Sequence, residues 1–190
     1  MCVYLIASEN IRKVKLVVSM QEMIVTERLC LRPFEPQDAT RVAELLANKV
    51  ISEMTSNIPY PYTESDAASW IASHRERYEN RTSIIYAVTL KQTGDLIGTV
   101  SLPKLSDGLG ILGYWLGVPY WGNGYATEAS KALIAHCKKH FGLKRLHVTH
   151  LAENQRSKSV VTKIGIQHVR NITSTVRGLP RDLCIYESDV

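Results

Sequence analysis

From residue 24 onward, the apolar residues of this 190-residue chain follow first a strand-like spacing and then a helix-like spacing. Within residues 24–34, apolar and polar side chains alternate after Thr26, which predicts a strand with one buried face. Residues 35–49 place apolar side chains at helical spacing behind Pro36, a residue that is favoured in the first turn of a helix. Residues 62–80 predict a further helix with Thr63 as its N-cap. The first third of the chain therefore reads as a strand followed by two helices.

Three strand patterns come next, over residues 83–90, 95–102 and 110–118. The connections between them are short and contain glycine, so an antiparallel meander is the simplest topology. Residues 125–142 then predict a long helix that ends at Gly142.

The remaining elements are a strand over 145–151, a helix over 153–165 and two strands over 166–173 and 182–188. This order predicts an α+β (mixed α/β) fold in which helices pack over a central sheet. A dinucleotide-binding fold would need repeated parallel βαβ units, and a meander does not provide them.

Composition places the chain among globular proteins. Hydrophobic residues make up 45% and charged residues 22% of the sequence, so a buried core rather than disorder is expected. We expect one domain over residues 24–190, because a chain of this length can cover a single core. The net charge of +5 is spread along the sequence, which favours a phosphate-bearing small molecule over DNA or RNA.

The four cysteines are far apart and show no paired spacing, so we expect free thiols, no disulfide framework and no metal site. No apolar run approaches the ~18 residues of a membrane span, and the first ten residues lack the basic start of a signal peptide. These features predict a cytoplasmic protein that does not bind membranes.

Residues 1–23 differ from the rest of the chain, because they lack turn signals and contain further methionines at positions 20 and 23. Two interpretations remain open. The segment is an N-terminal extension that lies upstream of the natural start, or it is an ordinary N-terminal strand or arm.

The most informative stretch is YWGNGYATEAS, residues 120–130, where a strand pattern passes into a helix pattern. Gly122 and Gly124 permit positive φ angles and a close approach to the main chain. Backbone N–H groups at the start of a helix lack intrahelical partners and favour a bound phosphate group. Neither a P-loop lysine nor a complete dinucleotide motif is present, so another phosphorylated ligand, or merely a tight turn, is expected.

The stretch GYWLGVPYWGNGYATEA resembles the acetyl-CoA-binding segment of the GCN5-related N-acetyltransferases (GNAT superfamily), in particular the branch of ribosomal-protein N-terminal acetyltransferases. Trp121 stands where the family usually has Gln or Arg. The resemblance covers residues 24–187 and includes TERLCLRPFEPQDA, TGDLIGTVSL and ENQRSKSVVTKIG. It implies a mostly antiparallel, twisted sheet of about seven strands with a V-shaped splay and about four flanking helices.

The resemblance also implies a site for acetyl-CoA as co-substrate. A bulge near Gly117 would splay the strand and free main-chain groups of Leu116, Gly117 and Val118 for the pantetheine arm. The N–H near Leu116 would bind the oxyanion. The phosphates would lie on the loop, with cofactor-binding residues Trp121, Gly122, Asn123, Gly124, Tyr125 and Ala126. The neighbouring Tyr114 and Trp115 fit packing within the strand better than contact with a substrate.

Asn154 and Ser157 lie at the start of the predicted late helix. The resemblance implies that Asn154 bonds the pantetheine arm and that Ser157 protonates the leaving thiolate. Simple capping by Asn154 is the structural alternative. No general base is evident, because residues 166–181 contain no Asp or Glu. Glu153, His150, His168 or a carboxylate of the first helices remain candidates, although each also fits a structural role.

The expected reaction is direct transfer of acetyl from acetyl-CoA to a primary amine, either a protein N-terminus or a small molecule. We expect acceptor specificity to lie in residues 53–62, which read as a loop. A non-catalytic acyl-CoA-binding or regulatory module is the alternative, and assembly as a homodimer is left open.

Overall fold

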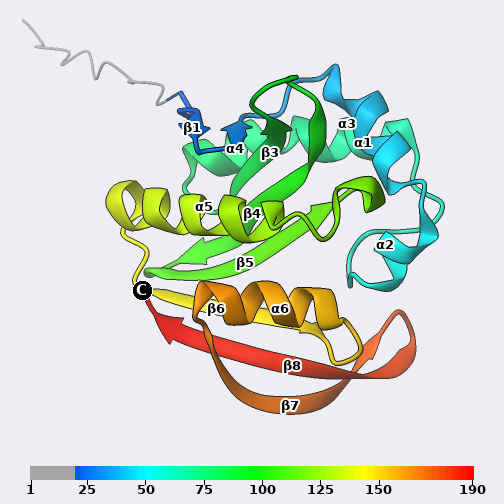
Figure 1. Ribbon diagram of the computed structural model, residues 1–190, viewed down its shortest axis with the longest axis vertical. Helices are drawn as coiled ribbons and strands as arrows, with labels where there is room; N and C mark the ends of the chain where they lie inside the picture. The colour runs from blue at the N-terminus through cyan, green and yellow to red at the C-terminus, as the bar shows by residue number, and fades with distance from the viewer. Residues whose placement is uncertain (1–19) are drawn as a thin grey trace, which may run out of the picture.

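An eight-stranded sheet runs through the part of the chain that the computed structural model describes, residues 20–190 (Figure 1). The strand order is β1-β2-β3-β4-β5-β6-β8-β7. All neighbours pair antiparallel except β5 and β6, which are parallel. The strands are β1 (Ile24–Val25), β2 (Leu29–Arg32), β3 (Ile84–Leu90), β4 (Leu96–Ser106), β5 (Leu109–Leu116), β6 (Arg145–Leu151), β7 (Gln167–Val176) and β8 (Leu179–Asp189).

The predicted meander and the mostly antiparallel sheet are confirmed. The strand count is one higher than expected, because a turn after Thr26 divides the predicted first strand into β1 and β2. Two hydrogen bonds join the residues just before β1 to β3: Gln21 Nε2 donates to the Ile85 carbonyl at 2.8 Å, and Tyr86 donates to the Glu22 carbonyl at 2.8 Å. The rest of the predicted extension, residues 1–19, lies outside the described residues.

The described helices are α1 (Asp38–Leu46), α2 (Lys49–Glu53), α3 (Glu64–Ala72), α4 (His74–Glu79), α5 (Tyr125–Phe141) and α6 (Gln155–Ile164), with a short 3₁₀ turn η1 (Val118–Tyr120). Two helix predictions need correction. Residues 62–80 form two helices, which meet at Ser73. The loop predicted from residue 53 is preceded by the unpredicted helix α2, which Asn48 caps by accepting from the Val50 N–H. A five-residue helix is too short to show a period.

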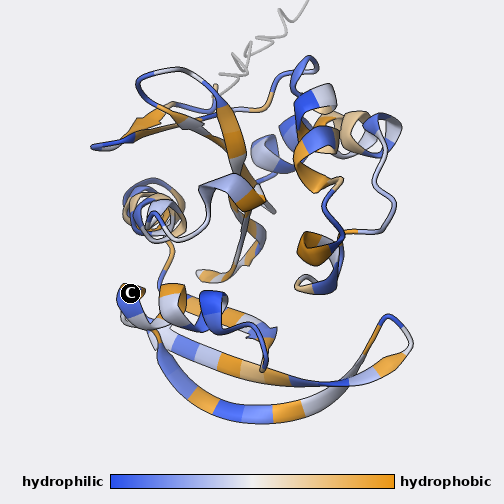
Figure 2. Ribbon diagram, turned by 45° about the vertical axis from the view of Figure 1, so that its right-hand side comes forward, coloured by the Kyte–Doolittle hydropathy of each residue, from blue (hydrophilic) through white to orange (hydrophobic). Residues whose placement is uncertain are grey.

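Helices cover both faces of the sheet, and the central strand β3 supplies buried side chains to both. In Figure 1, α5 and α6 lie in front of the sheet, while α1 and α3 lie behind it. Val88 packs in the core on the α5 side, whereas its neighbour Ala87 packs with Val42 of α1 and Ile71 of α3. Because both faces of β3 are buried, its residues are apolar without a clear alternation. Figure 2 shows how the β7–β8 hairpin curves away from this layered body.

The predicted V-shaped splay lies between β5 and β6. These two strands pair only at Leu109 with Arg145, Gly110 with Leu146 and Ile111 with His147. Beyond these pairs β5 continues beside β4, and β6 continues beside β8. The sheet therefore opens into a V at the ends of β5 and β6.

The bulge lies in β4 and not at Gly117, which corrects the sequence prediction. The β4–β5 register shifts between Ser101 and Lys104, where Pro103 has no N–H for the ladder. Bulges bend strands, and this one stands opposite the point where β5 leaves β6. Gly117 has an ordinary φ of −58°, and a Cβ there would meet Leu45 Cδ2 at 2.5 Å. Close packing against α1 therefore accounts for this glycine.

Within residues 20–190, every helix is too short or too polar to cross a bilayer. Cys30, Cys137 and Cys184 are free thiols, as expected, and Cys2 lies outside the described residues.

Candidate active site

The loop before α5 has the backbone that the glycine pattern predicts. Gly122 and Gly124 adopt φ angles of +81° and +79°. A Cβ on Gly122 would meet nothing within 4 Å, and one on Gly124 would meet only Arg28 Nη2, at 3.5 Å. The left-handed backbone, and not crowding by the protein, therefore requires glycine at both positions.

The first turn of α5 keeps its N–H groups available. Gly124 is the N-cap and has no side chain to bond them, and the first helical hydrogen bond runs from the Glu128 N–H to the Gly124 carbonyl. The N–H groups of Tyr125 and Ala126 therefore have no intrahelical acceptor, and the helix dipole adds a positive field. Asn123 turns its side chain back to donate to the Trp121 carbonyl at 3.2 Å. This turn therefore has the unpaired N–H groups that the predicted anion site requires.

Main-chain groups of Leu116, Gly117 and Val118 are engaged to different degrees. The Gly117 N–H donates to Ile97 of β4 at 2.9 Å, and the Val118 carbonyl accepts from Trp121. Since successive residues of a strand face opposite neighbours, the N–H and carbonyl of Leu116 point away from β4, toward the V. The carbonyl accepts from Trp121 Nε1 at 2.8 Å. Of the three predicted residues, Leu116 thus directs an N–H into the opening.

Asn154 and Ser157 meet at the start of α6. The Asn154 Oδ1 accepts from the Ser157 N–H at 3.0 Å, so the capping interpretation of Asn154 is confirmed. Its Nδ2 donates to the Met54 carbonyl just after α2, at 3.3 Å. Asn154 therefore joins α6 to the segment predicted to control acceptor specificity.

Ser157 has a partner across the V that the sequence did not reveal. The hydroxyls of Tyr114 on β5 and Ser157 on α6 are 2.7 Å apart. Burial raises the pKa of Tyr114 to about 12, although the hydrogen bond with Ser157 acts in the opposite direction. The phenol is thus protonated at neutral pH. The strand pattern predicts Tyr114 only as a packing residue, and nothing in its alternation with neighbours indicates this partner.

A second contact spans the same gap. The guanidinium of Arg156 lies 4.6 Å from the centre of the Trp121 ring, which is within the range of a cation–π interaction. Trp121 therefore contacts both sides of the V, through its indole N–H on β5 and through its ring on α6. The cation–π contact with Arg156 is one that the usual Gln or Arg would not provide.

The proposed general bases fall into different environments. Glu153 is ion-paired to Arg181, whose hydrogen bond lowers the pKa of the carboxyl and weakens it as a base. His168 is exposed and bonds Asn171 at 2.8 Å. His150 is buried, and because a carbonyl only accepts, its Nδ1 donates to the Leu151 carbonyl at 2.8 Å. This leaves His150 Nε2 as an acceptor without a hydrogen-bond partner.

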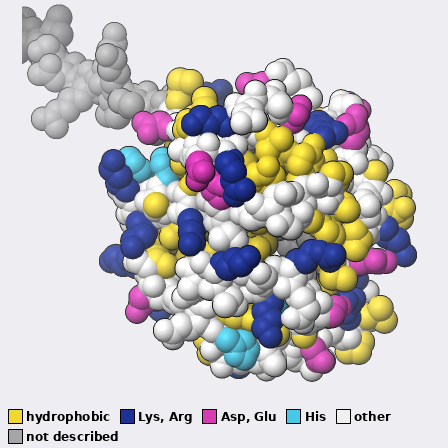
Figure 3. All heavy atoms as spheres, in the orientation of Figure 1, with side chains coloured by type: hydrophobic (Ala, Val, Ile, Leu, Met, Phe, Trp, Pro, Cys, Tyr) yellow, Lys and Arg dark blue, Asp and Glu magenta, His cyan; other side chains and the backbone are white. Residues whose placement is uncertain are grey.

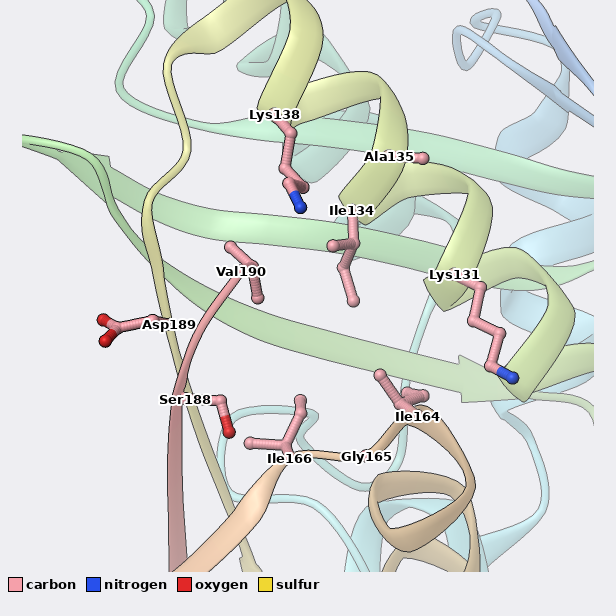
Figure 4. A pocket seen from close by; sticks show the side chains of 10 residues that line it. All are labelled: Lys131, Ile134, Ala135, Lys138, Ile164, Gly165, Ile166, Ser188, Asp189 and Val190. Atoms are coloured by element: carbon pink, nitrogen blue, oxygen red, sulfur yellow. The ribbon is translucent and has the colours of Figure 1, made fainter.

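A cavity of about 290 Å³ lies beside this site, between α5 and the C-terminal end of β8. Figure 4 shows Ile134 and Val190 near the middle of the cavity and Ile164 and Ile166 below them, while the Asp189 side chain points outward. It contains none of the predicted site residues. Figure 3 shows Lys and Arg side chains across this whole face, which agrees with an anionic ligand.

In the described range 20–190, no three His, Cys, Asp or Glu side chains gather closely enough to hold a metal ion.

Comparison with known proteins identifies the fold. The family described as "Acetyltransferase (GNAT) domain" matches residues 28–167. The chain belongs to the GNAT acetyltransferase family. The uncharacterized N-acetyltransferase YnaD of Bacillus subtilis (strain 168) is 30% identical over 146 residues, which cover 76% of this chain and 82% of YnaD. The predicted class, an acetyl-CoA-dependent N-acetyltransferase, is confirmed.

Two solved GNAT structures have the same fold. RimL, a ribosomal L7/L12 alpha-N-protein acetyltransferase in complex with coenzyme A, superposes with a TM-score of 0.81 at 16% identity, over 89% of this chain and 98% of RimL. The microcin C7 self-immunity acetyltransferase MccE, in complex with acetyl-CoA and AMP, gives a TM-score of 0.78 at 20% identity, over 87% and 94% of the two chains. The predicted GNAT fold is therefore confirmed.

Proposed function

We propose that this GNAT protein moves acetyl from acetyl-CoA to a primary amine by direct attack in a ternary complex. The main support is one juxtaposition. An uncapped helix N-terminus with two positive-φ glycines lies beside the open V between β5 and β6. The first can bind a diphosphate, and the second leaves strand edges for an extended pantetheine arm.

The chain supplies two of the groups that acyl transfer needs. As the amine attacks the thioester carbon, negative charge develops on the carbonyl oxygen, and the Leu116 N–H is oriented to bind it. When the carbon–sulfur bond breaks, Ser157 donates its proton to the thiolate. Either hydroxyl can donate across the 2.7 Å contact, and the Tyr114 hydroxyl also lies 3.3 Å from the Ser157 carbonyl. In this proposal Tyr114 donates to the Ser157 hydroxyl, because a phenol is a stronger acid than an alcohol.

The attacking amine has to lose a proton, and His150 has the one buried imidazole nitrogen in this group of candidates that is left as an acceptor. His150 also stacks on Tyr186, with ring centres 5.2 Å apart, so packing alone can account for its burial. We propose His150 as the base ahead of Glu153, which is ion-paired with Arg181, and His168, which bonds Asn171.

The acceptor belongs in the open end of the V. This end is bounded by α2 and the β7–β8 hairpin, where Arg177 donates to Ser52 and to the Ile58 carbonyl. RimL, which shares the fold, is a ribosomal L7/L12 alpha-N-protein acetyltransferase. A protein N-terminus is therefore our first choice of acceptor, and a small amine is the second.

The test is a substrate panel. The protein is incubated with acetyl-CoA and with peptides of different N-termini, polyamines or aminoglycosides, while CoA thiol release and the mass of each acceptor are followed. We expect thiol release together with the mass gain of one acetyl group on a peptide N-terminus. Binding of acetyl-CoA without release for any acceptor would support the non-catalytic module instead.

A further inference from the structure

Arg28 lies in the turn between β1 and β2, far in sequence from the GNG loop of residues 122–124, and contacts it directly. Its Nη1 donates to the Asn123 carbonyl at 2.9 Å, across 95 residues of sequence. The guanidinium also lies 4.8 Å from the centre of the Tyr125 ring. Arg28 thus contacts a residue between the two glycines and the first residue of α5.

Glu128, in the first turn of α5, holds Arg28 in this position. One carboxylate oxygen accepts from Thr26 Oγ1 at 2.6 Å and from the Arg28 N–H at 2.9 Å. The other accepts from Arg28 Nε at 2.7 Å and lies 2.7 Å from Nη2. Burial alone would raise the pKa of Glu128, but these hydrogen bonds outweigh it and lower the pKa. Glu128 is therefore ionised at neutral pH, and two nitrogens of the guanidinium edge converge on one of its oxygens.

The contact with Asn123 sets the direction of one N–H group. In a trans peptide the carbonyl and the following N–H point in opposite directions. Since the Asn123 carbonyl points to Arg28, the Gly124 N–H points away from it. A loop with two glycines has many backbone conformations of similar energy. Because the peptide plane is already fixed, the loop loses less conformational entropy when an anion binds, and binding is tighter.

We infer that Arg28 is a positioning residue for the donor: it orients the Asn123–Gly124 peptide so that the loop binds the diphosphate of acetyl-CoA. This inference rests on the proposed function. Arg28 acts through the main chain, because its own charge is already paired with Glu128.

Two variants and two donors test this role. Arg28→Lys keeps the charge but cannot bond Glu128 and Asn123 in the same planar arrangement, and Arg28→Ala removes the side chain. Binding is measured by calorimetry with acetyl-CoA, and turnover is measured with acetyl-CoA and with acetyl-pantetheine, a truncated donor that lacks the diphosphate. We expect both variants to bind acetyl-CoA about tenfold more weakly, with kcat and the use of acetyl-pantetheine unchanged.

Arg32→Lys is the matched control. Arg32 is the last residue of β2 and, like Arg28, pairs with a carboxylate. Its partner is Asp38 of α1, through contacts of 2.7 and 2.8 Å, and Arg32 does not reach the loop. A general loss of stability would therefore appear in this control as well, without a change in acetyl-CoA affinity.

The outcomes distinguish failure of the Arg28 role from failure of the proposed acetyltransferase function. Unchanged acetyl-CoA affinity in both Arg28 variants would overturn the inference, as would an equal loss with acetyl-pantetheine. If the wild-type protein itself binds no acetyl-CoA, the proposed function fails first, and the assigned role of Arg28 fails with it.

Discussion

The Ser157 hydroxyl carries one hydrogen, so it can act as an acid only when that hydrogen is not donated to Tyr114. When Tyr114 donates, the Ser157 hydrogen is free to point toward a thiolate in the V. The arrangement resembles a short relay in which the buried phenol polarises the alcohol. Tyr114 then affects the reaction only through its hydrogen bond to Ser157.

We predict that Ser157→Ala and Tyr114→Phe each lower kcat, the first by about 100-fold and the second by about tenfold, with little change in acetyl-CoA affinity. The double variant should be no slower than Ser157→Ala, because Tyr114 acts through Ser157. Steady-state kinetics on all four proteins measure the coupling. Losses that multiply in the double variant would mean that the two hydroxyls act independently.

Gly124→Val should weaken acetyl-CoA binding, since the new side chain would stand beside the anion site and disfavour the φ of +79°. Gly94→Val is the control for strain alone. Gly94 has a φ of +77° in the β3–β4 turn and open space around it. Both variants should lose about 1–2 kcal/mol of stability in denaturant unfolding. Equal acetyl-CoA affinity in the two variants would contradict the anion site.

At the scale of single elements, helix ends follow local rules that the sequence displays. Thr63 caps α3 in a reciprocal capping box with Asp66, and Asn154 caps α6. Gly142 and Gly165 end α5 and α6 with φ angles of +66° and +91°. All four ends are predictable, because each depends only on residues close by in sequence.

Thr63→Ala and Asn154→Ala should each destabilise the fold by about 1 kcal/mol through the loss of a cap. Only Asn154→Ala should also weaken acetyl-CoA binding, if its amide leaves the Met54 carbonyl for the pantetheine arm. Chemical unfolding and calorimetry on both variants provide the comparison. Identical donor affinity in both would leave Asn154 as a cap alone.

At the scale of the whole molecule, His74 couples pH to stability. It is buried among Phe34 and Trp70, and neither ring nitrogen has a hydrogen-bond partner. Burial lowers its pKa from 6.5 to about 4. Between these values the unfolded chain binds a proton that the folded protein excludes, so stability falls as the pH falls through this window.

We predict that wild-type protein loses about 3 kcal/mol from this group between pH 7 and pH 4. His74→Phe, which suits the aromatic surroundings, should lose that much less over the same range. Urea unfolding at several pH values measures both slopes. Parallel slopes would show that folding does not lower the pKa of His74.

Sedimentation of the wild-type protein would test assembly as a homodimer, which stays a prediction.

Local sequence determined most of the succession of strands and helices, the helix ends and the GNG loop, because backbone preference and capping depend on near neighbours. It did not reveal α2 or the break between α3 and α4. The motif also marked Asn154 and Ser157. Only the tertiary structure decided where the V opens, and that Tyr114 meets Ser157 across 43 residues and Arg28 meets Asn123 across 95. Such contacts arise from the placement of whole elements by core packing and strand register, which no short window of sequence contains.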